Sequence, residues 1–190
     1  MTDTIITVEN IEPIYAGFTT LSRVTLSDGR KSFQREVEDH GQAVAVLPYD
    51  PERRTALLVR LPRVPVMLAG VPDHLLEAPA GLIDPGEDAE ACARREAREE
   101  VGVELAKLEP VGTAWSSPGV STERLSLFLA PYRAADRTGA GGGLAEEDEN
   151  ITVVEMSLAD LVRLADDGRL TDLKTFCLVQ SLRLRRPELF

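Results

Sequence analysis

The sequence predicts a mixed α/β (α+β) sandwich, in which short helices flank a sheet and a region of strands precedes it. Apolar runs of strand length recur along the chain, and they alternate with one segment rich in Ala, Glu and Arg and with two amphipathic segments near the C-terminus. The 190 residues are 43% apolar and 28% charged, which suits one globular domain with a small appendage. We therefore assign residues 1–39 to an N-terminal β-strand region and residues 40–190 to the main domain.

The N-terminal region is expected to form strands over residues 3–38. One strand is expected from Ile14 to Leu26 and another from Ser32 to Val37, with Asp28-Gly29 between them. An Asp-Gly pair between two such runs is a strong hairpin signal, because glycine takes the left-handed backbone conformation without strain. This pattern predicts a small antiparallel sheet.

The main domain opens with two apolar runs, 42–48 and 55–61, which are separated by a turn. Nearly continuous apolar runs are typical of strands that are buried on both faces. Residues 62–74 contain three prolines and are expected to form a loop, after which residues 75–78 form a short strand.

A helix is expected from about Asp88 to Val101, where Ala, Glu and Arg dominate. A proline and acids precede it and Gly102 follows it, as helix starts and stops require. Three more strands and two more helices follow, at 108–115, 124–132, 151–156, 158–165 and 172–185. The glycine-rich and then acidic stretch at 137–150 predicts a mobile loop.

The formal net charge of −11 argues against binding to nucleic acid, because an acidic surface repels a phosphate backbone. It also means that a phosphate substrate needs a cation between itself and the protein, and metal ions are the natural candidates.

Two cysteines, Cys92 and Cys177, are too few for a disulfide framework, and we expect buried free thiols. The N-terminus has no basic segment followed by an apolar run, and no stretch approaches the roughly 18 apolar residues of a membrane span. A cytoplasmic protein without a membrane partner is the resulting expectation.

Residues 81–103 read GLIDPGEDAEACARREAREEVGV. This segment resembles the Nudix box, G-x5-E-x7-R-E-U-x-E-E-x-G-U, in which U is apolar. The matched positions are Gly81, Glu87, Arg95, Glu96, Glu99, Glu100, Gly102 and Val103. Ala97 is a small residue at a U position. The resemblance implies a Nudix α/β/α sandwich with a mixed sheet in residues 40–190.

The spacing of the glutamates has a physical meaning of its own. Glu96 and Glu100 are four residues apart on the expected helix, so their carboxylates lie on one face, and Glu99 shares the edge of that face. Like charges placed this close are unfavourable unless a cation binds them, and Mg²⁺ takes one or two carboxylates together with water and substrate phosphates. Arg95 is placed to bridge and orient the acids, among them Glu87.

The simpler interpretation is an exposed helix with a solvated acidic face. The flanking glycines and the arginine of the box favour a metal site over that interpretation, and Gly81 and Gly86 are expected to permit backbone geometry that other residues resist.

The resemblance extends beyond the box to the ADP-ribose and GDP-mannose (sugar-nucleotide) pyrophosphatase branch, through the segments LEAPAGLID (76–84), SSPGVSTE (116–123), AGGGLAEEDENI (140–151), LVRLPRV (58–64) and QREV (34–37). It implies a metal site of the Ala80 carbonyl, Glu96, Glu100 and Glu149. It implies catalytic roles for Glu147, Glu99, Arg95 and Glu87, with Glu147, or failing it Glu99 or Glu100, accepting the proton of the attacking water. It implies substrate contacts by Arg35, Glu36, Arg63 and Glu123.

Residue by residue, other interpretations stay open. The acids at 146–149 also fit a solvated loop, and Arg63 also fits a surface charge. Arg35 could pair with an acid on an adjacent strand, and the Ser-Pro-Gly segment could be a simple turn.

The expected reaction is Mg²⁺-dependent hydrolysis (with Mn²⁺ as the alternative ion) of the diphosphate in a GDP-mannose-type nucleotide sugar, giving a nucleoside monophosphate and a sugar phosphate. An ADP-ribose diphosphatase is the alternative within the same class, and a non-catalytic nucleotide-sugar sensor is the alternative outside it. A nucleoside triphosphate hydrolase and an RNA decapping enzyme fit less well, given the Ser-Pro-Gly segment and the acidic charge. The resemblance also implies a homodimer with exchanged N-terminal strands, in which Arg35 and Glu36 reach the neighbouring subunit's ligand.

Overall fold

The computed structural model describes residues 5–71, 75–144 and 150–190. The chain divides into two compact units. The first unit comprises the residues up to Gln42 together with 115–124, and the second comprises 43–114 and 125–190. The boundary between residues 39 and 40 remains a prediction. The structure adds that the segment 115–124 groups with the N-terminal strands.

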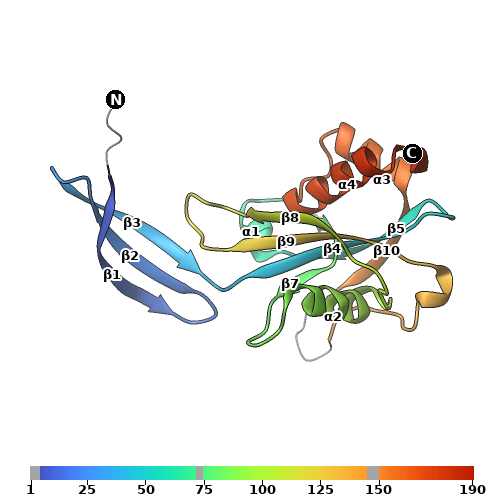
Figure 1. Cartoon of the computed structure of the whole chain (residues 1–190), viewed down its shortest axis with the longest axis horizontal. Helices are drawn as coiled ribbons and strands as arrows, with labels where there is room; N and C mark the ends of the chain where they lie inside the picture. Colours follow the sequence, from blue (N-terminus) through green and yellow to red (C-terminus); the bar gives the residue numbers. More distant parts are fainter. Residues whose placement is uncertain (1–4, 72–74, 145–149) are drawn as a thin grey trace. The chain divides into compact units, whose positions relative to one another are not determined.

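The first unit contains a three-stranded antiparallel sheet in the order β1-β2-β3 (Figure 1). Its strands are β1 (Thr7–Ala16), β2 (Thr20–Ser27) and β3 (Ser32–Asp39). The expected hairpin turn lies between β2 and β3. There the Asp28 carboxylate accepts hydrogen bonds from the backbone of Arg30 and Lys31, both at 2.9 Å, and Gly29 has a φ of 80°. These hydrogen bonds to the ionised carboxylate lower the pKa of Asp28.

The single strand expected from Ile14 to Leu26 is wrong. Residues 17–19 form a turn, in which the backbone N–H of Gly17 donates to the carbonyl of Thr19 at 3.0 Å, so the chain reverses between β1 and β2. Gly17 accommodates the Tyr15 side chain, whose hydroxyl lies 2.2 Å from where a Cβ of residue 17 would be. A glycine inside a run of strand-forming residues is the signal for this break.

The second unit is built on a mixed sheet in the order β10-β5-β4-β9-β8, with β6 paired to β5 and β7 paired to β4. β4 is parallel to β9 and antiparallel to β5 and β7, so the predicted mixed sheet is confirmed. Its strands are β4 (Ala43–Asp50), β5 (Thr55–Leu61), β6 (Leu75–Glu77), β7 (Ala80–Leu82), β8 (Glu109–Trp115), β9 (Arg124–Pro131) and β10 (Thr152–Ser157).

Helices cover both faces of this sheet, as the α/β/α expectation requires. Helix α2 (Ala89–Val101) lies on one face, and α3 (Leu158–Asp166) and α4 (Leu173–Arg185) lie on the other (Figure 1). Successive side chains of β4 alternate between the two cores. Ala45 and Leu47 pack on the α3 and α4 side, and Val44 and Val46 pack on the α2 side. Both cores draw on β4, which explains why every residue of this strand is buried.

The proline-rich stretch 62–74 is not wholly a loop, because Val64–Leu68 forms a short helix, α1. Pro65 lies in its first turn, where the missing N–H leaves no helical hydrogen bond unmade. Short 3₁₀ helices occur at Ala134–Asp136 and Pro187–Leu189. Within the described ranges, no helix combines the length and the apolar character needed to cross a membrane.

Candidate active site

Helix α2 has the two ends that its sequence predicts. The Asp88 side chain caps the start by accepting a hydrogen bond from the Ala91 N–H at 2.8 Å. Gly102 ends it in the left-handed conformation with a φ of 68°. Ala93 and Ala97 are fully buried against the sheet, so the small side chains let the helix lie close to it. This packing fixes which face of the helix carries the glutamates.

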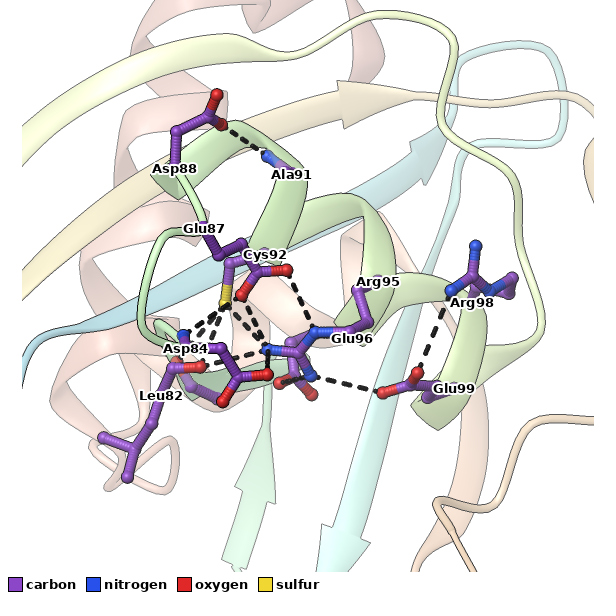
Figure 2. A network of polar contacts seen from close by, with 11 residues as sticks. Leu82, Asp84, Glu87, Asp88, Ala91, Cys92, Arg95, Glu96, Arg98 and Glu99 are labelled. Atoms are coloured by element: carbon purple, nitrogen blue, oxygen red, sulfur yellow. Dashed lines mark hydrogen bonds and ion pairs between the residues drawn. The ribbon is translucent and has the colours of Figure 1, made fainter.

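Arg95 is the centre of the charge network on α2 (Figure 2). Its guanidinium donates to both carboxylate oxygens of Glu87 at 3.1 and 3.0 Å, to Glu96 at 2.7 Å and to Glu99 at 3.3 Å. It also donates to the carbonyl of Leu82 at 3.0 Å, which ties the helix to β7. The bridging role predicted for Arg95 therefore has a defined geometry.

The electrostatics follow from this geometry. The hydrogen bonds from Arg95 lower the pKa of Glu87 to about 2, and those to Glu87 raise the pKa of Arg95. Burial raises the pKa of the neighbouring Cys92 thiol to about 12. Cys92 is a buried free thiol, as expected, and it donates to the Leu82 carbonyl at 3.2 Å. Cys177 is also a free thiol, and it is only partly buried.

Glu96 and Glu100 converge on the backbone of β7. A Cβ on Gly81 would lie 1.8 Å from Oε1 of Glu96, so only glycine leaves room for this carboxylate. The Ala80 N–H donates to Oε2 of Glu100 at 3.0 Å. The structure thus brings together Ala80, Glu96 and Glu100, three of the four residues expected to bind metal. Glu149, the fourth, lies outside the described residues.

The reason predicted for Gly81 needs correction. Its φ is not in the left-handed region, whereas Gly86 has a φ of 88° as expected. Gly81 is required by the close approach of Glu96, and Gly86 by its backbone conformation.

The donor set suits a hard divalent cation. Glu100 is 2% exposed and Glu96 is 9% exposed, and buried carboxylates are costly unless cations or hydrogen-bond donors compensate them. Two carboxylates beside a backbone segment are the kind of protein ligands that Mg²⁺ accepts, with water and phosphate completing the shell. Among the residues described, no three His, Cys, Asp or Glu side chains form a metal-binding group on their own. A metal at this site therefore depends on further oxygen ligands.

The glycine-rich segment lies against the C-terminal end of α2, although 137–150 was predicted to be mobile. The N–H groups of Gly142 and Gly143 donate to the carbonyls of Glu100 and Glu99 at 2.8 and 3.1 Å. A Cβ on Gly141 would lie 2.4 Å from the Glu100 carbonyl, so the approach requires glycine. These hydrogen bonds satisfy carbonyls in the last turn of α2, and the mobility of 137–150 remains a prediction. Glu147 lies outside the described residues.

Arg63, which is expected to bind substrate, is bound to a buried carboxylate three residues before Ala80. Its Nε and Nη2 donate to the two oxygens of Glu77 at 2.8 and 2.9 Å, and Lys174 from α4 binds the same carboxylate. Sequence reasoning assigned no role to Glu77 or Lys174. The available signal was one acid in the apolar run that ends at Ala78, because a buried acid needs a cation.

The other expected substrate residues belong to the first unit. Arg35 and Glu36 line a cavity of about 390 Å³ together with Val24, Leu26, Val37, Trp115 and residues 118–122. Arg35 lies over the Phe33 ring at 5.0 Å, and none of the ion pairs found among the described residues includes it. Glu123 accepts a hydrogen bond from Nε2 of His40 at 3.1 Å and thereby holds the segment 115–124 to the end of β3.

Comparison with known proteins supplies the deciding observation. The NUDIX domain family matches residues 39–178.

The chain belongs to the Nudix family.

Nudix relatives extend the match over most of the chain. It is 42% identical over 153 residues to a GDP-mannose pyrophosphatase of Cronobacter sakazakii, covering 80% of this chain and 78% of the relative. It is 40% identical over 152 residues to a GDP-mannose pyrophosphatase of Pectobacterium atrosepticum, covering 80% and 77%. The enzyme class expected from the box, a Nudix pyrophosphatase, is confirmed.

A solved structure agrees with the architecture. A crystal structure of an ADP compounds hydrolase superposes with a TM-score of 0.75, covering 96% of this chain and 95% of that chain. The sequences are 22% identical, so this likeness supports the fold.

Proposed function

We propose that this Nudix enzyme hydrolyses the diphosphate of a GDP-mannose-type nucleotide sugar with Mg²⁺, to a nucleoside monophosphate and a sugar phosphate. The observation that carries the proposal is that the Glu96 and Glu100 carboxylates both lie against β7, with Glu96 held by a hydrogen bond from Arg95. The curated relatives, named GDP-mannose pyrophosphatases, support the substrate class.

The residues act mainly by positioning and by electrostatics. When bound, Mg²⁺ neutralises charge on the diphosphate and makes a water more acidic. Glu96 and Glu100 supply the anionic surface that retains the ion, and Arg95 keeps Glu96 turned toward β7. Arg63 donates to a phosphate oxygen, where charge spreads during the displacement. We assign proton acceptance to Glu147, or otherwise to Glu99 or Glu100, and a further metal contact to Glu149.

We propose that the first unit, through Arg35 and Glu36, helps to recognise the nucleotide bound to the neighbouring subunit. The cavity beside Arg35 and Glu36 has apolar walls and two charged groups, which is the composition of small-molecule sites. Trp115 offers a ring for stacking, and Arg124 already lies over it at 5.6 Å.

We also propose a homodimer through the N-terminal strands. All ten residues of β1 are exposed, and large apolar side chains there include Ile11, Ile14 and Tyr15. Exposed apolar surface of this kind marks association sites. Light scattering behind a sizing column is expected to give twice the 20.7 kDa chain mass, and a monomer would remove the dimer.

A substrate panel tests the function. GDP-mannose, ADP-ribose, other nucleotide sugars and a nucleoside triphosphate are each incubated with and without Mg²⁺, and products are identified by mass. The proposal predicts the fastest Mg²⁺-dependent turnover with GDP-mannose, giving GMP and mannose phosphate. Preference for ADP-ribose would replace the substrate, and binding without turnover would establish a sensor.

A further inference from the structure

Glu77 is a buried carboxylate bound by two cations. Its side chain is 2% exposed. Arg63 donates to Oε1 through Nε at 2.8 Å and to Oε2 through Nη2 at 2.9 Å, while the ammonium of Lys174 also binds Oε2. Within the described part of the chain, Nη1 of Arg63 has no acceptor. Nε and Nη2 form one edge of the guanidinium and are committed to Glu77, and Nη1 lies off that edge.

The start of α4 holds Lys174 in place. Asp172 binds the Lys174 ammonium at 3.0 Å and caps the helix by accepting from the Thr175 N–H at 3.0 Å. The Thr175 hydroxyl donates to Asp172 and accepts from the Ala78 N–H at 2.6 Å. This chain of hydrogen bonds connects α4 to the backbone two residues before Ala80.

The two cations, Arg63 and Lys174, are balanced by two carboxylates, Glu77 and Asp172. Burial alone would raise the pKa of Glu77, but the hydrogen bond from Arg63 and the charge of Lys174 outweigh burial and lower the pKa. The pKa of Arg63 is raised chiefly by its hydrogen bond to Glu77, and the charge of Glu100 contributes to the same shift. Glu77 lies three residues before Ala80, whose N–H binds Glu100, and this places the group of Glu77, Arg63 and Lys174 next to the proposed metal site.

We propose that Glu77 and Lys174 are positioning residues that act on the substrate diphosphate through Arg63. Glu77 aims the guanidinium so that Nη1 faces the phosphate, and Lys174 neutralises part of the Glu77 charge so that Arg63 keeps positive charge for the substrate. The inference rests on the proposed function and adds two residues to it. Without Lys174, Arg63 would be the only cation on a buried carboxylate and would attract phosphate less.

The test is a double-mutant cycle between Arg63→Ala and Lys174→Met. Arg63→Ala is expected to raise KM for GDP-mannose about tenfold, the change that corresponds to losing one charge-assisted hydrogen bond. Lys174→Met is expected to raise KM several-fold with a smaller change in kcat, and Lys174→Arg to restore it. If Lys174 acts through Arg63, the double variant has the KM of Arg63→Ala alone.

Lys107→Met is the matched control, because Lys107 also pairs with a glutamate, Glu109, but is 67% exposed. It is expected to leave KM unchanged. Independent, multiplying effects of Arg63→Ala and Lys174→Met would overturn the proposal, as would an unchanged KM in Lys174→Met. Thermal unfolding of each variant separates these outcomes from loss of the fold.

A second readout keeps this inference separate from the substrate assignment. Calorimetric titration with inorganic pyrophosphate and Mg²⁺ measures diphosphate binding directly, whichever nucleotide sugar is hydrolysed. Weaker pyrophosphate binding in Lys174→Met than in Lys107→Met supports the positioning role even if GDP-mannose is not turned over. Equal binding in the two variants overturns it, while wild-type hydrolysis of GDP-mannose would leave the proposed function standing.

Discussion

Helix α2 buries charged side chains, whereas strand β1 exposes apolar ones. Glu96 and Glu99 on α2, together with Glu87 just before it, all accept hydrogen bonds from Arg95, and Glu96 and Glu100 are buried. On β1, every residue is exposed, including large apolar ones. Charge is buried where we propose that the chain performs chemistry, and apolar surface is exposed where we propose that it meets a second copy. A buried charge points to a ligand, whereas an exposed apolar strand points to a partner.

The largest expected effect comes from removing a buried charge on α2. Glu100→Gln keeps the shape of the side chain but removes the anion, so kcat is expected to fall by a hundredfold or more, on the order of the loss of one preorganised electrostatic contact. Steady-state kinetics at saturating Mg²⁺ measures this. Glu104→Gln is the control, because Glu104 is exposed just beyond the helix. Full activity of a folded Glu100→Gln variant would remove the metal assignment.

A smaller effect is expected from the arginine that organises the acids. Arg95→Lys keeps a charge but cannot bind both oxygens of Glu87 together with Glu96. The expected loss is about ten- to a hundredfold in activity or in apparent Mg²⁺ affinity, the usual range for residues that orient metal ligands. Activity measured across a Mg²⁺ titration checks this. Arg98→Lys, at an arginine that is 54% exposed, is the control and should behave as wild type.

Gly81→Ala is expected to act on stability and activity together. The added methyl group would meet the Glu96 carboxylate, and overpacking of this kind costs about 1–3 kcal/mol. Chemical denaturation measures the change in free energy of unfolding. Gly139→Ala is the control, since its Cβ would lie at an ordinary contact distance of 3.7 Å from its nearest neighbour. Equal stability of the two variants would show that Glu96 does not lie against Gly81.

The smallest effect is expected in the first unit and depends on pH. Burial alone would lower the pKa of His40, but its hydrogen bonds to Glu38 and Glu123 outweigh burial and raise it. Protonated His40 therefore adds stability that is fully present below its ordinary pKa of 6.5 and is lost as pH rises through the higher pKa of the folded state. Protection factors from hydrogen exchange, which are corrected for the intrinsic rise of the exchange rate with pH, should fall for residues 115–124 over that interval. In His40→Gln this pH dependence should be absent, and its persistence would contradict the assignment.

Local sequence signals allowed much of the second unit to be predicted. The bounds of α2 follow from Asp88 and Gly102, and the role of Arg95 follows from helical spacing. The pairing of Glu77 with Lys174 could not be predicted in this way, because 97 residues separate them and no local pattern connects them. The docking of Gly142 on α2 was missed for a related reason. A glycine-rich composition indicates freedom of the backbone but not the close approach that glycine also permits.

Divalent metal binding tests the central claim most directly. Free Mn²⁺ can be counted by electron paramagnetic resonance during titration of the wild-type protein and of the Glu96→Gln/Glu100→Gln double variant. The account predicts saturable Mn²⁺ binding to the wild type, competition by Mg²⁺, and loss of that binding in the double variant with its fold retained. Equal Mn²⁺ binding by the two proteins would contradict it.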